Sequence, residues 1–344
     1  NKWQERKDRN RAEQAFKSEH RDVLLEPGEG GAAADSDERF EPHLDASDAE
    51  PTARPVREAS GKRVVPELPP AVDQRADCII LIEAIEPLEA HRLWPVQREQ
   101  LDGLSKTVRW FAFDDNTNLW CQLTPNSAGS HHWFCAAMQL VDRLGPIGEA
   151  DYMRFSGGVQ RVAEQFLAVP AGLPARAEAL GNATELDRFC ADVDVQIGIN
   201  VVSANGQPFH GTKIRGLAEA EGLVLADDGS FQARDEHGNI LFNLANLESA
   251  PFVLDSMRSL QTSGLTFVID VPRVGNGTAA FDRMMQLAAH FADALHGVVV
   301  DDNRAPFGVE AAGMIRNQIA QFQNHMASRE IPAGGPLAKR LFSV

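Results

Sequence analysis

The chain has 344 residues, 43% of them hydrophobic, which is enough to bury the cores of about two domains besides unstructured segments. Its formal net charge of -16 at pH 7 repels phosphate backbones and argues against nucleic acid as a partner. The four cysteines lack Cys-x-x-Cys spacing, and the adjacent His131 and His132 would point to opposite faces of a strand, so no metal site is predicted. No run reaches roughly 18 apolar residues, so the chain as given is not predicted to span a membrane.

Residues 1–75 are predicted to form a tether rather than a domain. Trp3 followed by a basic cluster is typical of the cytoplasmic flank of a transmembrane helix, although the start of an ordinary solvated helix explains these residues equally well. From Asp22 to Glu50 the chain has ten acidic residues and one basic residue, so we expect this segment to be disordered. The prolines that follow stiffen the linker toward polyproline II. We therefore expect a juxtamembrane segment and a disordered, acidic and Pro-rich linker.

Residues 76–185 are predicted to form a first folded module. The apolar pattern begins with a strand at 77–85 and continues with a helix that has Pro95 in its first turn. Two hairpin strands, a third strand and an amphipathic helix follow, at 108–113, 119–123, 131–141 and 152–166. This order of elements predicts a mixed sheet and helix module.

Residues 190–328 repeat this order and predict a second module. Its strand, helix, hairpin, strand and helix lie at 195–202, 212–222, 231–244, 265–271 and 281–295. The hairpin 231–244 aligns with 110–123 without a gap, which indicates one module used twice. A last amphipathic helix, which includes Ile319, closes the second module, and residues 329–344 are expected to form a flexible tail.

The second module resembles a known family. The segments ILFNLANL, LTFVIDVPRVGNG, FDRMMQLAAHFADAL and GVVVDDNR, within about residues 192–322, are similar in sequence and order to the C-terminal FtsZ-binding domain of ZipA-like cell-division proteins. The resemblance implies a split β-α-β fold for this module, an antiparallel sheet with helices on one face. Together with the repeat, it predicts an α+β fold of two tandem modules of this kind. It also implies that the open sheet face binds the C-terminal peptide of FtsZ, with no cofactor and no small-molecule substrate.

Membrane attachment is a further implication of this resemblance. ZipA-like proteins tether FtsZ filaments to the cytoplasmic side of the bacterial inner membrane at the division site, through an N-terminal helix that is absent from this chain. The tether expected at residues 1–75 fits that scheme.

Strand alternation predicts which residues lie on the open faces. In the second module the apolar floor is small, whereas the family prefers larger side chains there, and it consists of Leu241, Ala245 and Val268. The first module has a more aromatic and methionine-rich face, predicted as Ile79, Leu81, Phe111, Phe113, Trp120, Met138 and Leu140. Because such side chains anchor peptides well, the groove is placed on the first module as an alternative site. Equally, another part of the chain could cover this face.

Catalytic motifs are weak in this sequence. The glycines at 28–31 lie in the tether and those at 275–277 in a turn, while Asp301 and Asp302 would diverge on a strand. We therefore favour a non-enzymatic cell-division scaffold that binds FtsZ. The alternative is a structural or regulatory division protein with both sheet faces covered and a different partner or self-association. A third hypothesis, an acid-base enzyme using Asp301 or His131, would need a deep polar pocket.

Overall fold

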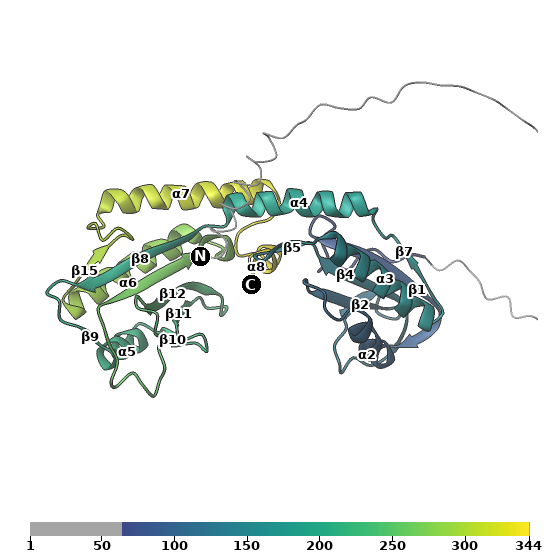
Figure 1. The fold of residues 1–344 in the computed structure, drawn as a ribbon, viewed down its shortest axis with the longest axis horizontal. Helices are drawn as coiled ribbons and strands as arrows, with labels where there is room; N and C mark the ends of the chain where they lie inside the picture. The colour runs from purple at the N-terminus through teal and green to yellow at the C-terminus, as the bar shows by residue number, and fades with distance from the viewer. Residues whose placement is uncertain (1–63, 344) are drawn as a thin grey trace, which may run out of the picture. The chain divides into compact units, whose positions relative to one another are not determined.

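A computed structural model describes residues 64–343 of the chain. Trp3, the predicted acidic segment and most of the Pro-rich linker lie outside these residues. From Leu68 onward the chain forms one compact unit that contains two main sheets and two short two-stranded ones. Both main sheets are antiparallel and packed with helices, which confirms the predicted α+β class (Figure 1).

The first sheet has five strands in the order β3-β2-β4-β1-β7. Its strands are β1 (Asp77–Glu89), β2 (Val108–Asp114), β3 (Leu119–Gln122), β4 (Ser130–Gln139) and β7 (Ala168–Ala171). Its helices are α2 (Ala90–Gln100), α3 (Glu149–Gln165) and α4 (Arg176–Val193), and a two-stranded ribbon joins β5 (Val141–Asp142) to β6 (Gly145–Pro146). The helix α2 begins before the predicted start, so Pro95 lies inside it.

The second sheet has six strands in the order β10-β11-β12-β14-β8-β15. They are β8 (Gln196–Ser203), β10 (Val224–Leu225), β11 (Phe231–Arg234), β12 (Ile240–Asn246), β14 (Gly264–Asp270) and β15 (Gly297–Val300). Its helices are α5 (Gly211–Ala220), the short 3-10 turn η1 (Val271–Arg273), α6 (Gly277–Leu295) and α7 (Val309–Ser328). A separate pair of short strands consists of β9 (Phe209–His210) and β13 (Gln261–Thr262).

Helix α6 shows how the local sequence positions the second core. Apolar residues recur along one stripe, and they are buried from Phe281 to Leu295. The helix starts where Asn276 Oδ1 accepts a hydrogen bond from the Ala279 N–H at 3.2 Å, and it ends at His296, whose φ of 57° is left-handed. The stripe packs against the inward residues of β12, β14 and β8, so the opposite face of the sheet is free of this helix.

The hairpins of the two sheets differ, so the predicted gapless correspondence does not extend to their strand order. In the first sheet the earlier hairpin strand, β2, pairs with β4, whereas in the second sheet the later one, β12, pairs with β14. Strand burial explains the difference. Trp110 and Phe111 are buried on opposite faces of β2, whereas β3 is mostly exposed and forms the edge.

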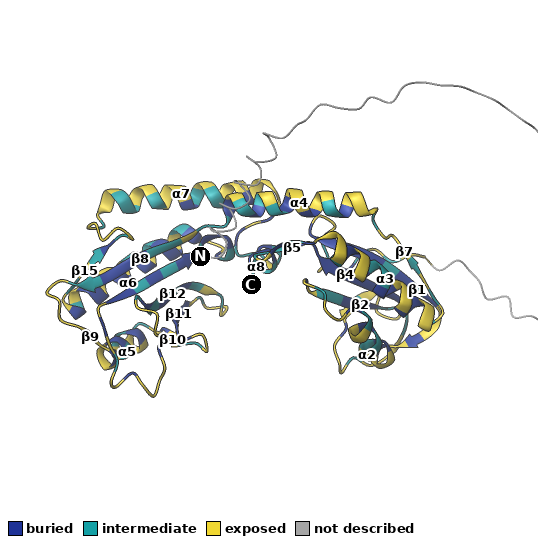
Figure 2. Ribbon diagram, in the orientation of Figure 1, coloured by how far each residue is buried: buried dark blue, intermediate teal, exposed yellow. Residues whose placement is uncertain are grey.

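The C-terminal segment corrects the prediction of a flexible tail at 329–344. It contains helix α8 (Pro336–Leu341), and Leu341 and Phe342 are buried in the same apolar cluster as the inner face of the first sheet. The apolar end of the chain therefore completes the first core. Helix α7 contributes Met326 to that cluster, although much of its surface is exposed (Figure 2).

Candidate peptide-binding faces

The outward face of the second sheet lies opposite α6. Along β12 the burial alternates, so Phe242 and Leu244 are buried while Leu241 and Ala245 are half-buried. On β14 the half-buried Val268 pairs with Asn243 of β12. The structure therefore places the three predicted floor residues on one face.

Leu241 and Val268 also line a hollow of about 250 Å³. Ala245 is not among its lining residues. Side chains on the rim come from η1 and α8 as well as from the sheet, and they include Asn239, Asp270, Arg273 and Lys339. This hollow is large enough for about one aliphatic side chain.

The polar groups of this hollow differ in whether they have hydrogen-bond partners. Asp270 accepts hydrogen bonds from Arg143 at 2.7 and 2.8 Å, and Lys339 Nζ donates to Asn239 Oδ1 at 2.6 Å. Within residues 64–343, Asn243 Oδ1 is buried without a hydrogen-bond partner. A buried acceptor of this kind costs free energy until a donor reaches it. The face thus offers an apolar floor, a buried acceptor without a partner in the described structure, and a cationic rim.

The outward face of the first sheet carries five of the predicted residues. Ile79 and Phe111 are buried in a small cluster with Cys135 and Ala137, and Leu81 and Trp120 pack against it. Phe113 faces Trp120 across the β2·β3 pair, with 5.2 Å between the ring centroids. Two further residues of that cluster, Leu68 and Val72, come from the segment before β1 and cover part of this face.

Met138 and Leu140 do not lie on the outward face, which corrects the prediction. Both are buried in the inner core, on the side of the sheet that packs against helices. The register decides this, because Met138 pairs with the inward Cys78, while Ala137 pairs with the outward Ile79. Strand β4 is apolar on both faces, so its sequence does not show which of its side chains point toward the helices. Prediction missed the outward Cys135 and Ala137, which aligning β4 with β1 would have found.

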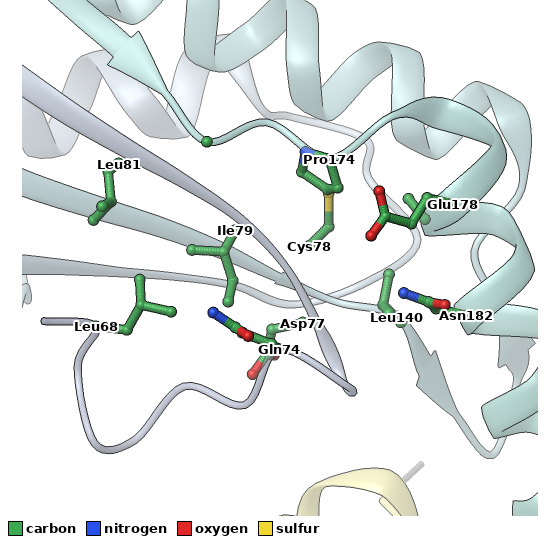
Figure 3. Close-up of a pocket in the computed structure, with 12 residues that line it drawn as sticks. Leu68, Gln74, Asp77, Cys78, Ile79, Leu81, Leu140, Pro174, Glu178 and Asn182 are labelled. Atoms are coloured by element: carbon green, nitrogen blue, oxygen red, sulfur yellow. The ribbon is translucent and has the colours of Figure 1, made fainter.

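A second hollow, of about 490 Å³, lies beside β1 (Figure 3). Apolar Ile79 and Leu81 share it with polar Glu178 and Asn182. Cys78 also lines it, but burial, with the nearby Asp77, raises the pKa of this thiol to about 12. Its sulfur stays protonated at neutral pH, so it is a poor nucleophile.

The side chains of Asp301 and His131, on which the enzyme hypothesis depends, form hydrogen bonds with backbone groups. Asp301 Oδ1 accepts hydrogen bonds from the N–H groups of Asn303 and Ala305 at 2.9 and 2.8 Å, which forms a turn. The ring of His131 is hydrogen-bonded through Nδ1 to the Phe113 carbonyl at 2.8 Å. In the described part of the chain, no group of three or more His, Cys, Asp or Glu side chains could hold a metal ion. The helices between residues 64 and 343 include none with the length and hydropathy to cross a membrane.

Comparison with known families bears directly on the second module. A family model described as "ZipA, C-terminal FtsZ-binding domain" matches residues 195–318. Over this module the chain is ZipA-like. The match begins with β8 and ends in α7, so it includes the face formed by β12 and β14, whereas the first sheet lies outside it.

Curated relatives agree with this assignment. The cell division protein ZipA of Vibrio cholerae O395 is 30% identical over 131 residues, which is 37% of this chain and 45% of the relative. ZipA of Marinobacter nauticus VT8 is 28% identical over 38% of this chain and 40% of the relative. ZipA of Xanthomonas axonopodis pv. citri is 26% identical over 40% and 58%, respectively. The similarity to these ZipA proteins thus spans roughly half of their length.

Proposed function

We propose that this chain is a non-enzymatic cell-division scaffold whose second module binds the C-terminal peptide of FtsZ on its outward sheet face. The observation that carries the proposal is the match to the ZipA FtsZ-binding domain, which falls on a module whose β12 and β14 expose an apolar hollow. The curated relatives are named as cell division proteins, which supports the same process.

Binding would use side-chain burial and hydrogen bonding, without any covalent step. An aliphatic or aromatic anchor of the peptide would fill the hollow against Leu241 and Val268, and an N–H group would reach Asn243 Oδ1. The cations Arg273 and Lys339 on the rim would attract acidic groups of the peptide. Ala245 would extend the contact along β12. Recognition of this kind needs no cofactor, metal or small-molecule substrate.

The finer part of the proposal is that the scaffold tethers FtsZ to the bacterial inner membrane, on its cytoplasmic side at the division site. The support is the sequence of the N-terminal region, where Trp3 and the basic residues after it are typical of a membrane flank. The acidic, Pro-rich linker would then give the folded modules reach.

Binding of a labelled FtsZ C-terminal peptide to the full chain tests the proposal. Val268→Lys places a charge in the hollow and should weaken binding at least about tenfold, since a desolvated cation costs more than about 1.4 kcal/mol. Trp120→Lys is the matched control, because Trp120 is also half-buried on an outward sheet face. Loss of binding with Trp120→Lys alone would move the site to the first module. No binding by the unmodified chain would reject the function.

A second candidate is a structural or regulatory division protein with a partner other than FtsZ or with self-association. Leu68 and Val72 pack on the outward face of the first sheet, so another part of the same chain covers some of that face. This packing favours the second candidate. Sedimentation of the chain alone would show concentration-dependent assembly if self-association is its role.

A further inference from the structure

The segment Leu68–Val72, here named the strap, lies on the outward face of the first sheet. Leu68 and Val72 pack against the cluster of Ile79 and Phe111, and the intervening Pro69 is buried. Figure 3 shows Leu68 beside Ile79 and Leu81 of β1. The strap makes a tight turn in which the Val72 N–H donates to the Pro69 carbonyl at 2.9 Å. Two aliphatic side chains four residues apart therefore meet one apolar surface.

Arg109 of β2 holds the backbone of the strap. Its Nη1 donates to the Ala71 carbonyl at 2.8 Å, and its Nη2 donates to Asp77 Oδ2 at 3.0 Å. The guanidinium also lies 5.6 Å from the ring centroid of Phe111, which fixes it above the same face. A cation that binds a main-chain carbonyl acts on any peptide backbone, because it does not depend on the side chain of Ala71.

The strap is anchored at its C-terminal end. The Asp73 N–H donates to Asp77 Oδ2 at 2.9 Å, and the N–H groups of Ala76 and Asp77 donate to the Asp73 carbonyl. Leu68, at the other end, is held by apolar contact and is only half-buried. The strap therefore has one firm end and one weakly held end, so its release can begin at Leu68 without unfolding the sheet.

Proline-containing peptides are recognised by apolar, aromatic-lined surfaces. The strap presents a proline and two aliphatic anchors to such a surface, and Arg109 binds one of its carbonyls. We propose that the strap is a built-in ligand of the first module, and that it closes a second peptide-binding face to external proline-containing peptides with aliphatic residues four positions apart. This proposal does not depend on peptide binding by the second module.

A tethered ligand competes strongly. The short connection to β1 gives the strap an effective concentration of at least about millimolar, so an external peptide with the same contacts is excluded at micromolar concentration. The first module is then closed until the strap is displaced, even though its face has the composition of a binding site.

The test uses the full chain and a labelled peptide with the sequence of residues 66–76. The variant Leu68→Ser/Val72→Ser removes both aliphatic anchors from the strap and should bind the peptide at least about tenfold more tightly than the unmodified chain. Val64→Ser/Val65→Ser is the matched control, because these side chains are 88% and 59% exposed and make no part of the cluster. Adding Trp120→Ala to the strap variant should weaken the binding again.

Amide hydrogen exchange supplies a second measurement. Exchange in β2 and β3 should rise in the strap variant, while β12 and β14 stay protected. If the double variant does not fold, Leu68→Ala alone should give the same change at β2, because Leu68 holds the weak end. A folded variant with neither peptide binding nor faster exchange at β2 would overturn the proposal and leave the strap as a plain covering.

Discussion

Arg340 pairs with Asp77 at 2.9 Å, and the Asp77 side chain is fully buried. Arg340 lies on α8 near the end of the chain, whereas Asp77 begins β1, so this pair fastens the C-terminal helix to the first sheet. Arg109 donates to the same carboxylate at 3.0 Å. One buried anion thus holds α8, the strand β2 and, through Arg109, the strap.

Asp77→Ala should lower the free energy of unfolding by about 3–5 kcal/mol, because it leaves Arg109 and Arg340 without their shared buried anion. Urea denaturation followed by circular dichroism measures this. Glu330→Ala is the control, since its pair with Arg75 at 3.0 Å is exposed and should contribute at most about 1 kcal/mol. Equal effects of the two variants would contradict the role given to Asp77.

Asp151 should make stability depend on pH. Burial opposes ionisation of this carboxyl, but hydrogen bonds from Ser105 and Gly148 outweigh it and hold its pKa below the ordinary 3.8. The unfolded state then binds more protons, so stability is present above that value and is lost as the pH falls through the folded pKa. Asp151→Asn should flatten the loss of stability as the pH falls below about 4. Because it weakens the hydrogen bond that Asp151 accepts from Gly148 at the start of α3, it should also lower stability at pH 7 by about 1 kcal/mol. Asp102→Asn, at an exposed position, is the control and should change stability by less than about 0.5 kcal/mol.

Two adjacent glycines of α3 should respond in opposite ways to alanine. A Cβ at Gly158 would lie 2.4 Å from Leu101 Cδ2 and 2.8 Å from the Gln100 carbonyl oxygen, so Gly158→Ala should destabilise the protein by about 1–3 kcal/mol. A Cβ at Gly157 would meet only the movable Arg161 guanidinium at 3.3 Å. Gly157→Ala should therefore stabilise the helix by up to about 1 kcal/mol. Thermal melting of both variants compares them, and a stabilising Gly158→Ala would show that α2 and α3 are not in close contact.

Phe342 should be essential to the first core despite its place near the end of the chain. Its side chain is fully buried, so Phe342→Ala should cost about 3–5 kcal/mol in unfolding free energy. Val309→Ala, at a residue that is 92% exposed, should change it by less than about 0.5 kcal/mol. If hydrogen exchange in β1 and β4 is unaffected by Phe342→Ala, the C-terminal helix does not belong to that core.

Replacing Asn243 should weaken peptide binding without lowering the stability of the protein. Because its buried Oδ1 lacks a partner in the described structure, Asn243→Ala should leave the unfolding free energy unchanged or slightly raised. The same variant should weaken binding of the FtsZ peptide about fivefold, which corresponds to one hydrogen bond of about 1 kcal/mol. Thr266→Ala, on the same face but outside the hollow, should bind normally. Unchanged binding by Asn243→Ala would show that the peptide makes no use of this acceptor.

The local sequence pattern correctly predicted those helices and strands that have one apolar and one polar face. The stripe from Phe281 to Leu295 predicted α6, and the alternation along β12 placed Leu241 and Ala245 outward. The resemblance of the second module to the ZipA family depended on these same segments, and the family match to residues 195–318 agrees with it.

The sequence alone therefore determined the α+β class, the ZipA-like second module and the faces of its amphipathic elements, because periodicity records which side of an element meets water. Only the tertiary structure decided the phase of β4, where Met138 turned inward, since a strand buried on both faces carries no such record. Packing between distant segments likewise placed Leu68 on the first sheet and Phe342 in its core. These contacts join residues far apart in the chain, and short apolar segments of this kind do not specify in sequence which surface will cover them.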